Sequence, residues 1–538
     1  MEGACYDVVV LGSGVAGLTC AVVAHDAGLS VVVLEKAPKV GGVTAYSGGG
    51  LWVPNNHLMK EAGLSDSLEE AMAYARFLSP VPPDEELLVS WLKGAPEAVR
   101  YLEERAGIKW QIVRGYPDYY YPRAGKPEGR YLEAPPIAID KLGEYSDKLV
   151  VSPHVPVGIT HGEMLSMGGQ VGFRNWDFTL LGDRLKNGIM TFGPGLVCNL
   201  LRALLERKVP IHLSTPARRL ISRAGRVVGV VAEKDGETIT FESRRGVLIA
   251  TGGYDWDRDL FMRFEGLPEW GSTAPPFVEG DNLKLACELG AAVTGVPPYA
   301  LPTLLSVRVP GEEHFGRPLY RLLLEAGAPG YIIVNKSGRR FVNESFYYNV
   351  VSKVRAFDSA TSSWPNWPCY LVFDHRTRER YTLATLAPGM PLPEGMGVTC
   401  DTLAELADRL GIDREELART VSRFNTFAEK GVDEDFHRGE IVKGGDPSNK
   451  PNPNLAPIRD PPFYGVKLEI GSVGVNAIGL KIDGRARVLD VHGNPIPGLY
   501  AAGNSAATVD TSGGYNSGLG NSRGMTLGYI AARDMSGL

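Results

Sequence analysis

A glycine-rich turn near the N-terminus constrains the fold of this chain more than any other feature. Residues 7–11 form a short apolar strand, the sequence GSGVAG then places Gly12, Gly14 and Gly17, and residues 18–27 have the composition of a helix. Gly12 permits a tight turn, Gly14 lets the backbone approach a pyrophosphate, and Gly17 lets the helix pack closely on the strand. The arrangement predicts a Rossmann-type unit whose helix begins at the phosphates of a bound dinucleotide.

Three further segments support a dinucleotide site. The strand SVVVLEK ends in Glu35, where a carboxylate accepts hydrogen bonds from the ribose hydroxyl groups of an adenosine. The segments GVLIATGGYD, at 246–255, and PGLYAAGN, at 497–504, are apolar strands that end in small residues. Strand ends of this kind allow a cofactor to approach the backbone. The expected contacts there are Thr251, Gly252, Gly503 and Asn504.

These segments resemble the nucleotide-contact segments of flavoproteins with a two-dinucleotide fold, and KVGGVTAYSGGG at 39–50 completes the resemblance. The resemblance implies FAD, bound by parts of the chain that lie far apart in sequence. Succinate dehydrogenases carry a flavin-linked histidine near this segment, whereas this chain has Tyr46 and Ser47, so we expect non-covalent FAD. The other contacts that the resemblance implies are Gly42, Thr44, Ser47, Gly48, Gly49 and Ala217.

Length, charge and cysteine spacing limit the other possibilities. A chain of 538 residues exceeds one ordinary hydrophobic core, so we expect two domains. A net charge of -6 provides no basic surface for a phosphate backbone, and we expect no nucleic-acid partner. The six cysteines are scattered without a CxxC pair, which predicts no metal site or cluster. No apolar run is long enough to span a membrane and no cleavable leader is evident, which predicts a cytoplasmic protein.

The pattern along the chain predicts an α/β protein with an inserted domain. Alternating runs between 209 and 250, separated by Gly225 and Gly236, indicate a hairpin-rich β insertion in the parallel sheet. A helix is expected at 279–295, after which the composition changes to proline-rich loops. We predict a Rossmann-type FAD-binding domain of residues 1–295 and 456–538, with an α+β cap domain of residues 296–455 between its two parts.

Within the predicted cap, Asp401 and Asp413 are expected to cap two helices. The stretch SSWPNWP, at 362–368, places two tryptophans beside prolines in a loop. We expect this loop to pack on the cap. The alternative is a surface loop that makes a peripheral contact with a membrane where an apolar substrate is stored.

Motifs in both predicted domains carry a more specific resemblance. They are TAYSGGGLWVP from Thr44, YPDYYYPRAGKPEGRYLE from Tyr116, GRRFVNESFYY from Gly338, FDHRTRERY from Phe373 and GGYNSGLGNSRGMTLGYIAARDM near the C-terminus. The chain resembles the fumarate reductase and 3-ketosteroid dehydrogenase superfamily, and within it the ketosteroid Δ1-dehydrogenase branch. Dicarboxylate reductases would show a GGxHGxNRLGG segment, whereas this chain has Tyr515 and Ser517 in place of its histidine and arginine.

The resemblance implies a set of catalytic residues. Tyr515, with a backbone N–H of the small residues Ser517 and Gly518, would hold a ketone oxygen. Tyr348 would lie near the abstracted proton, with Tyr347 as the alternative in register. Tyr119 would support it, with Tyr120 and Tyr121 as alternatives. Phenols suit this chemistry because loss of a hydride two bonds from a carbonyl becomes feasible as the adjacent proton leaves and an enolate forms.

The predicted activity is therefore introduction of a C=C bond next to the carbonyl of a cyclic ketone, first of all Δ1-dehydrogenation of a 3-ketosteroid, with an external electron acceptor. Two departures from the Δ1 branch leave undecided which bond is desaturated and which ring system the substrate has. The segment YNSG resembles relatives that desaturate 5α-ketosteroids at the 4,5 bond, and EIGSVGVNAIGL lacks the GTKGG of the Δ1 branch. A cyclohexanone-type ketone and a fumarate reductase-like enoate or dicarboxylate reductase are the alternatives. The insert at 156–193 has no predicted role.

Overall fold

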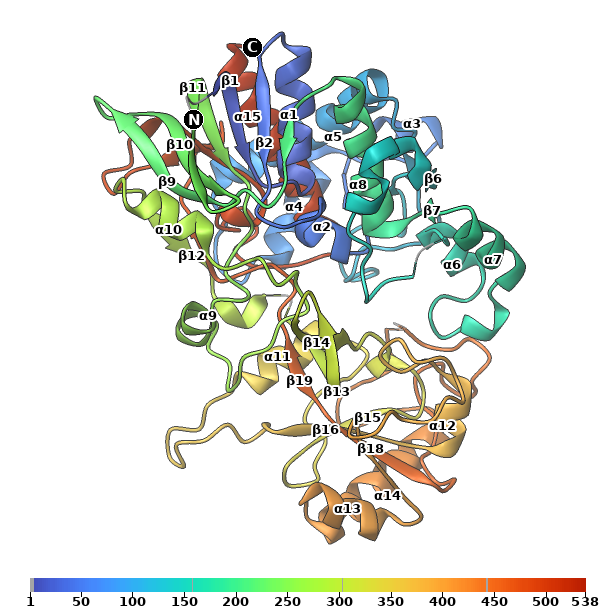
Figure 1. The fold of residues 1–538 in the computed structure, drawn as a ribbon. Helices are drawn as coiled ribbons and strands as arrows, with labels where there is room; N and C mark the ends of the chain where they lie inside the picture. Colours follow the sequence, from blue (N-terminus) through green and yellow to red (C-terminus); the bar gives the residue numbers. More distant parts are fainter. Residues whose placement is uncertain (1–3, 157, 302, 442–443) are drawn as a thin grey trace.

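The chain folds into two lobes (Figure 1). The computed structural model describes residues 4–538 except 157, 302 and 442–443, and it does not describe the side chains of 347–349. One lobe contains both ends of the chain and carries the glycine-rich turn; we call it the Rossmann lobe. The other, coloured yellow to orange in Figure 1, is the cap.

An eight-stranded sheet forms the centre of the Rossmann lobe, in the order β21-β22-β11-β1-β2-β8, with β10 and β9 continuing from β11. The pairs β1–β2, β1–β11, β11–β22 and β2–β8 are parallel. The valine-rich strands are buried on both faces, as in parallel sheets covered by helices. The strands are β1 (Ala4–Leu11), β2 (Val31–Leu34), β8 (Ile211–His212), β9 (Ala217–Arg223), β10 (Arg226–Lys234), β11 (Glu237–Ile249), β21 (Arg487–Leu489) and β22 (Pro495–Ala501).

The predicted β insertion is present, and it shares a strand with the parallel sheet. The first half of β11 pairs antiparallel with β10, while its second half lies parallel between β1 and β22. Gly225 and Gly236 occupy the two hairpin turns with positive φ angles of 76° and 80°. Strand β11 therefore connects the insertion directly to residues 250–253, which follow the end of this strand.

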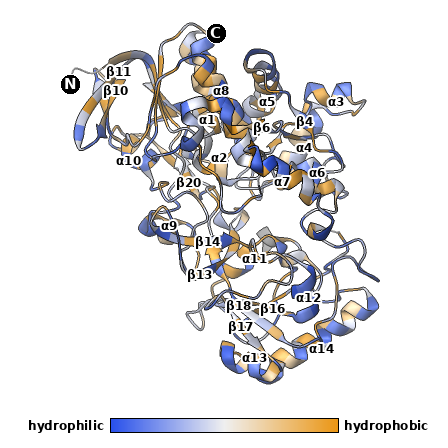
Figure 2. Cartoon of the chain, turned by 45° about the vertical axis from the view of Figure 1, so that its right-hand side comes forward, coloured by the Kyte–Doolittle hydropathy of each residue, from blue (hydrophilic) through white to orange (hydrophobic). Residues whose placement is uncertain are grey.

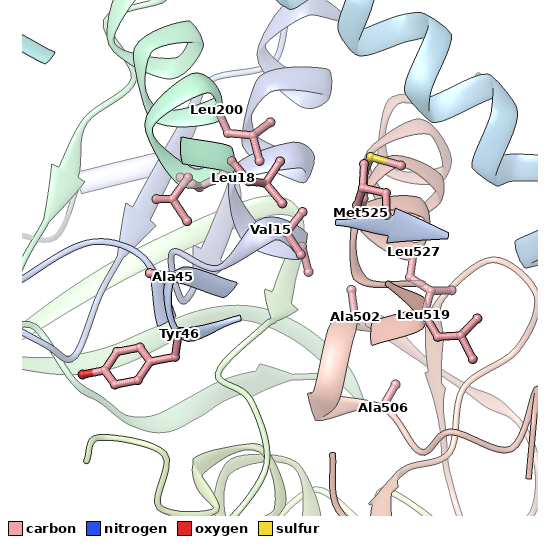
Figure 3. Close-up of a cluster of buried hydrophobic side chains, with 14 of the residues drawn as sticks. Val15, Leu18, Ala45, Tyr46, Leu200, Ala502, Ala506, Leu519, Met525 and Leu527 are labelled. Atoms are coloured by element: carbon pink, nitrogen blue, oxygen red, sulfur yellow. The ribbon is translucent and has the colours of Figure 1, made fainter. Parts of the chain in front are cut away.

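Helices α1 (Val15–Asp26), α8 (Phe192–Glu206) and α15 (Leu519–Ser536) form the core beside the sheet: α1 and α15 pack against its strands, and α1 contacts both α8 and α15. Figure 3 shows Leu18 beside Leu200 in this core, with Met525 of α15 in the same buried cluster. Glycine allows α1 and α15 to touch, because a Cβ atom at Gly528 would lie 2.3 Å from the Ala16 carbonyl oxygen. The core thus fixes the start of α1 beside the start of α15, and both starts face the cavity between the lobes.

The Rossmann lobe is completed by short strands and helices. Its remaining strands are β3 (Leu51–Trp52), β4 (Gln111–Ile112), β5 (Tyr131–Glu133), β6 (Ile137–Ala138), β7 (Ile189–Met190), β12 (Val293–Gly295) and β20 (Ile478–Leu480). Its remaining helices are α2 (Gly42–Tyr46), α3 (His57–Glu61), α4 (Leu68–Leu78), α5 (Glu85–Ala106), α6 (His161–Ser166), α7 (Phe178–Lys186), α9 (Arg258–Phe264) and α10 (Asp281–Cys287). The helix expected at 279–295 ends early, because Gly290 turns the chain (φ 77°) into β12.

The cap contains two antiparallel sheets, ordered β14-β13-β19 and β15-β16-β18-β17. Its strands are β13 (Leu304–His314), β14 (Arg317–Leu322), β15 (Ile332–Asn335), β16 (Cys369–Asp374), β17 (Val398–Cys400), β18 (Phe463–Lys467) and β19 (Glu469–Gly471). Its helices are α11 (Tyr347–Val354), α12 (His375–Arg380), α13 (Leu403–Leu410) and α14 (Arg414–Lys430). Strand pairing places 463–471 in the cap, beyond the boundary that the sequence suggested at 455.

The outer helices of the cap show alternating polar and apolar faces (Figure 2). Helix α14 buries Leu417, Val421 and Phe424, which lie on one face at helical spacing. Asp413 caps α14 as expected, accepting from the Glu416 N–H. The prediction for Asp401 was wrong by one residue: Thr402 caps α13, because its hydroxyl oxygen is the one that accepts from the Glu405 N–H.

The tryptophan loop reaches from the cap to the Rossmann lobe. The indole N–H of Trp367 donates to Glu269 at 3.2 Å, and Phe357 meets the ring of Trp364 at 4.9 Å between centroids. Ser362 and Pro365 are exposed, so part of the loop faces solvent, and Phe357, which precedes the loop, is 51% exposed. Of the helices in the described ranges, none combines the length and apolar character needed to cross a membrane.

Candidate active site

A continuous cavity of about 710 Å³ lies between the lobes. Its walls contain the glycine-rich turn, segment 42–50, the strand ends at 250–252 and 502–504, and the C-terminal loop at 515–521. All predicted cofactor contacts line it except Gly17, which lies behind the turn. The cap contributes residues such as Leu324 and Ser345, so the cavity has one wall from each lobe.

The glycines of the turn have different roles. Gly12 has a φ of 105°, and a Cβ atom there would lie 2.3 Å from the Ala250 carbonyl oxygen. A Cβ atom at Gly17 would lie 2.0 Å from the Gly12 carbonyl oxygen, so this glycine is required for helix and strand to pack. At Gly14 the nearest atom would be the Thr44 hydroxyl oxygen at 3.5 Å, which leaves this face open to a ligand. Gly12 thus forms the tight turn and Gly17 allows the close packing, while the approach of a pyrophosphate at Gly14 stays a prediction.

Glu35 supports the turn as well as lining the cavity. Its carboxylate accepts from the Ser13 N–H at 2.9 Å, from the Ser13 hydroxyl at 2.6 Å and from the Ala37 N–H at 2.8 Å. Burial raises the pKa of this carboxyl group, although these donors oppose the shift. A carboxylate so fixed beside the turn is suited to accept hydrogen bonds from ribose hydroxyl groups.

The segment around α2 is tightly constrained. The Thr44 hydroxyl oxygen accepts from the Val15 N–H at 3.0 Å and so occupies the first turn of α1. A Cβ atom at Gly49 would lie 2.2 Å from the Phe192 carbonyl carbon. The amide of Asn521, a residue that the sequence analysis missed, donates to the Ser47 hydroxyl at 3.0 Å. This bond ties the predicted FAD segment to α15.

The residues present fit a dinucleotide. The buried hydroxyl group of Thr251 has no hydrogen-bond partner among the described residues and lines the cavity. Gly252 and Gly503 adopt positive φ angles of 80° and 63° at the two strand ends, and Ala217 and Asn504 complete the wall. An unpaired buried hydroxyl beside an open glycine turn indicates that a ligand provides the missing partner.

Tyrosines gather at the other end of the cavity. Tyr515 and Tyr119 both line it, with ring centroids 6.3 Å apart. Burial raises the pKa of Tyr515 to about 12, so its phenol stays protonated at neutral pH. In the described part of the chain, the Tyr515 hydroxyl and the Gly518 N–H have no hydrogen-bond partner, and Ser517 lies between them. Two donors therefore remain free beside the cavity.

Two further phenols, which the sequence analysis did not single out, complete this group. Tyr116 stacks on Tyr131 at 4.5 Å between centroids, and both line the cavity. The Tyr131 hydroxyl lies 3.4 Å from the Ser517 hydroxyl. Both lie in the motif YPDYYYPRAGKPEGRYLE, Tyr116 at its start and Tyr131 near its end, so the motif contained both residues without indicating a role for either.

The insert at 156–193 brings a histidine to the cofactor segment. His161 begins α6 and packs on Gly48, where a Cβ atom would lie 2.9 Å from the His161 Cε1. Burial lowers the pKa of His161 to about 4, and that of His154 to about 4 as well. Both imidazoles are therefore neutral at pH 7. Segment 39–50 contains no histidine, but the fold supplies one from elsewhere in the sequence.

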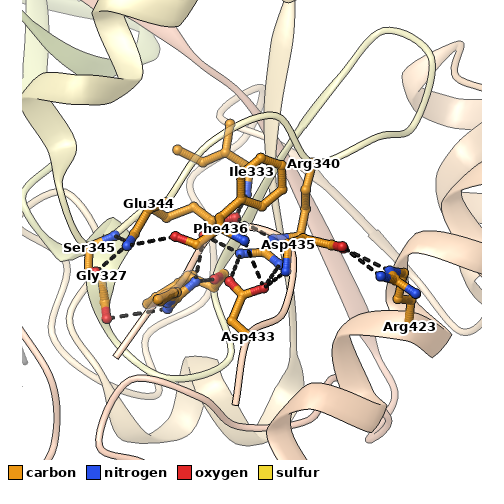
Figure 4. A network of polar contacts seen from close by, with 12 residues as sticks. Gly327, Ile333, Arg340, Glu344, Ser345, Arg423, Asp433, Asp435 and Phe436 are labelled. Atoms are coloured by element: carbon orange, nitrogen blue, oxygen red, sulfur yellow. Dashed lines mark hydrogen bonds and ion pairs between the residues drawn. The ribbon is translucent and has the colours of Figure 1, made fainter. Parts of the chain in front are cut away.

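Tyr348 and its alternative Tyr347 lie in α11, but their side chains are outside the described part of the structure. The motif before α11 is structural. The Glu344 carboxylate, fully buried, pairs with Arg340 at 2.9 Å and Arg438 at 3.1 Å, and Arg340 also pairs with Asp433 at 2.8 Å (Figure 4). This network fixes the chain at the point where α11 begins.

Comparison with known proteins identifies the family. The family model described as FAD binding domain matches residues 7–522. A 4-oxocyclohexanecarboxylate 2-dehydrogenase from Sinomonas cyclohexanicum is 37% identical over 99% of this chain and 93% of its own length. A 3-oxosteroid 1-dehydrogenase from Mycobacterium tuberculosis is also 37% identical, over 98% of this chain and 97% of its own. This chain belongs to the fumarate reductase and 3-ketosteroid dehydrogenase superfamily of flavoproteins.

A solved structure agrees with this assignment. The 3-ketosteroid Δ1-dehydrogenase from Sterolibacterium denitrificans, in complex with 1,4-androstadiene-3,17-dione, matches with a TM-score of 0.89 and 32% identity over 99% of both chains. The predicted superfamily, the predicted Rossmann fold with its cap and the FAD cofactor are confirmed. As a flavoprotein of this superfamily, the chain binds FAD. The role of each individual residue toward FAD stays a prediction.

Proposed function

We propose that this flavoprotein is a dehydrogenase that introduces a C=C bond next to the carbonyl of a cyclic ketone, with 3-ketosteroids as its substrates and the Δ1 position as the site of reaction. The pair of free donors at Tyr515 and Gly518 is the observation that carries the proposal. They face the same cavity as the predicted FAD contacts, and a ketone oxygen can accept from both.

The charge of the cavity favours a neutral substrate over a dicarboxylate. A dicarboxylate reductase needs cationic groups that hold two carboxylates, and arginine suits that task because of its forked geometry. None of the described residues that line the cavity is an arginine. Its lysines, Lys36 and Lys39, follow Glu35 in sequence, and Lys36 is already paired with Glu279 at 2.6 Å. Arg523, near the C-terminal motif, is paired with Asp510 at 2.7 Å.

The phenols divide the work of the reaction. Tyr515 stays protonated and donates, with the Gly518 N–H, to the ketone oxygen on which negative charge develops. A tyrosine of α11, Tyr348 in the register proposed from the sequence, acts as a phenolate and accepts the proton next to the carbonyl, and Tyr119 supports it. Bound FAD supplies the acceptor for the hydride that leaves the neighbouring carbon. The apolar residues of the cavity exclude water from the developing enolate.

A second candidate substrate is a cyclohexanone-type ketone. The supporting observation is the relative named 4-oxocyclohexanecarboxylate 2-dehydrogenase, which is as similar to this chain as the 3-oxosteroid 1-dehydrogenase. A substrate of that kind carries a carboxylate, and the absence of arginine among the described cavity residues favours the steroid. The chemistry at the carbonyl is the same for both.

Anaerobic mixing tests the proposal. The oxidised protein is mixed with androst-4-ene-3,17-dione, with 4-oxocyclohexanecarboxylate or with succinate, and the loss of oxidised flavin absorbance is followed. In parallel, chemically reduced protein is mixed with fumarate. We expect the steroid to reduce the flavin fastest and to lose two hydrogen atoms, which mass spectrometry detects. Rapid reoxidation by fumarate without reduction by either ketone would reject the proposal.

A further inference from the structure

Tyr131 lies between the two halves of the active site. It begins β5, and its side chain is 3% exposed. On one side is Gly50, at the end of the predicted FAD segment; a Cβ atom there would lie 2.0 Å from the Tyr131 Cζ. On the other side is Gly518, where a Cβ atom would lie 3.0 Å from the Tyr131 Cε2. The phenol ring therefore fills a slot with a glycine on each wall.

The walls of the slot carry the two sets of predicted functional groups. The Gly50 wall continues into Ser47, Gly48 and Gly49, and the Gly518 wall continues into Ser517 and Tyr515. A main-chain hydrogen bond from the Trp52 N–H to the Gly518 carbonyl, at 3.1 Å, joins the walls at one end. Tyr131 is in contact with both walls. A Cβ atom at Gly518 would also lie 2.6 Å from the Trp52 backbone nitrogen, so the backbone holds the walls together at that end, and the Tyr131 ring is the side chain that lies against both.

The remaining faces of the ring are also covered. Tyr116 stacks on Tyr131, with ring planes 29° apart, and His161 meets it edge-on at 5.5 Å between centroids. The ring cannot turn without displacing one of these neighbours. Its hydroxyl contact with Ser517 is long, at 3.4 Å, so the polar bond contributes less to the position of the ring than packing does.

We propose that Tyr131 is a positioning residue that sets the distance between the FAD segment 47–50 and the ketone-binding loop 515–518. The inference rests on the proposed function, since it concerns where Tyr515 and Gly518 hold the ketone relative to the flavin. Spacing of this kind matters because a displacement of roughly 1 Å away from the reactive geometry can cost about 100-fold in rate.

Substitutions at Tyr131 distinguish the contribution of the ring from that of its hydroxyl group. Tyr131→Phe keeps the ring, and we expect its limiting rate of flavin reduction to stay within about tenfold of the wild type, because only a weak hydrogen bond is lost. Tyr131→Leu leaves a void beside both glycines, and we expect the limiting rate to fall by about 100-fold while FAD remains bound. The ketone concentration at half-saturation should change much less than the limiting rate.

A buried tyrosine outside the cavity provides the control for stability. Tyr529, on α15, is 6% exposed and packs on Tyr101 at 5.6 Å between centroids. Tyr529→Leu should lower the unfolding temperature as Tyr131→Leu does, but leave the limiting rate of flavin reduction unchanged. Reduction of the flavin by dithionite, which does not use the ketone-binding loop, should be alike in all variants.

A compensating substitution gives a sharper test. Gly50→Ala introduces a Cβ atom where the ring lies, so we expect it to slow flavin reduction when Tyr131 is present. In the double variant Gly50→Ala/Tyr131→Leu the added methyl group enters the space that the ring has left. The double variant should therefore be faster than the product of the two single effects predicts.

The outcomes distinguish the inference from the proposed function. If no ketone reduces the flavin of the wild type, the proposed function is rejected, and the role of Tyr131 in it is rejected too. If a ketone reduces the wild type and Tyr131→Leu at equal rates, or if the effects of Gly50→Ala and Tyr131→Leu simply multiply, Tyr131 does not set the spacing and the proposed function stands. A slow Tyr131→Leu variant with a faster double variant supports both.

Discussion

The Nε2 atom of His314, in the cap, forms a hydrogen bond with the hydroxyl group of Tyr46, in the Rossmann lobe. His314 ends β13, and the hairpin that follows reaches the cofactor side of the cavity. Phe315 at its tip packs edge-on against Phe277, with centroids 5.2 Å apart, and Tyr46, Phe277 and Phe315 all line the cavity. The hairpin therefore closes one side of the space in which FAD is expected to lie.

Loosening this hairpin should accelerate the release of FAD. Arg317 pairs with Glu279 at 2.5 Å, and Glu279 also pairs with Lys36 beside the turn. Arg317 is partly exposed, so its ion pair contributes about 1 kcal/mol or less, or up to about a fivefold change in rate. We expect the double variant His314→Ala/Arg317→Ala to release FAD about tenfold faster, as measured by flavin fluorescence after dilution. The control is Arg308→Ala, on the same strand; an equal effect there would contradict the prediction.

The flavin should be non-covalent. Acid or heat denaturation should release intact FAD into the supernatant, because segment 39–50 lacks a histidine. The structure makes this test informative, since His161 lies against Gly48 and is a nucleophile within reach of the cofactor side of the cavity. Flavin that stays with the denatured protein, and moves with a peptide containing His161 after digestion, would show that the prediction is wrong.

Glu35→Ala should weaken FAD binding. Loss of charge-assisted hydrogen bonds to the ribose costs about 1.5 to 3 kcal/mol, or roughly 10- to 150-fold in the dissociation constant. Because Glu35 also holds Ser13 in the glycine turn, Glu35→Gln should retain part of the affinity. Titration of the apoprotein with FAD measures both. The control is Glu233→Ala, at a partly exposed position in β10; unchanged affinity in Glu35→Ala would exclude it as the ribose ligand.

Two buried histidines should make the folded state acid-sensitive. The pKa of His154 and of His161 is about 4 in the folded chain, against an ordinary value of 6.5. The unfolded chain takes up these protons between pH 6.5 and pH 4 and the folded chain does not, so stability is lost as the pH falls through that range. Each histidine contributes on the order of 3 kcal/mol to the difference.

Denaturant unfolding at pH 7 and at pH 4.5 measures this effect. We expect His161→Asn to lose less stability between the two pH values than the wild type does, because one of the two groups no longer titrates. His492→Asn is the matched control, since His492 is exposed. Equal losses in the wild type and in His161→Asn would show that His161 is already protonated or accessible in the folded protein.

The sequence identified most of the residues that line one side of the cavity, for a physical reason. A dinucleotide requires a tight turn, an open glycine and a carboxylate at fixed separations along one βαβ unit, and Gly12, Gly14 and Glu35 satisfy all three within a short segment. The β insertion could also be predicted, because the alternation of apolar and polar residues and the turn glycines are local features. Local chemistry of this kind leaves a pattern that a single sequence can reveal.

The parts that the sequence did not predict depend on contacts between distant segments. His161 reaches Gly48 through the insert at 156–193, and Tyr131 meets both Gly50 and Gly518. No spacing along the chain specifies these contacts. The cap boundary was placed too early for the same reason: β18 and β19 complete cap sheets that began far upstream. At Asp401 the alternative was local, and the neighbouring Thr402 forms the cap because its side chain is the one aligned with the first turn.

Tyr515→Phe tests the chemical step most directly. The Tyr515 hydroxyl is free, protonated and close to the equally free Gly518 N–H, so one of two donors to the ketone oxygen is removed while the shape of the cavity is kept. Loss of one such donor typically costs about 100- to 1000-fold in turnover. We expect the limiting rate of flavin reduction by the best ketone to fall by a factor in that range, with FAD still bound.

Rapid mixing isolates this step from slow product release, which otherwise conceals the loss. Tyr464→Phe is the control, because that ring stacks on Phe373 in the cap and is not among the described residues that line the cavity. If Tyr515→Phe reduced its flavin at nearly the wild-type rate, the enolate would be stabilised elsewhere and the role given to Tyr515 would be wrong.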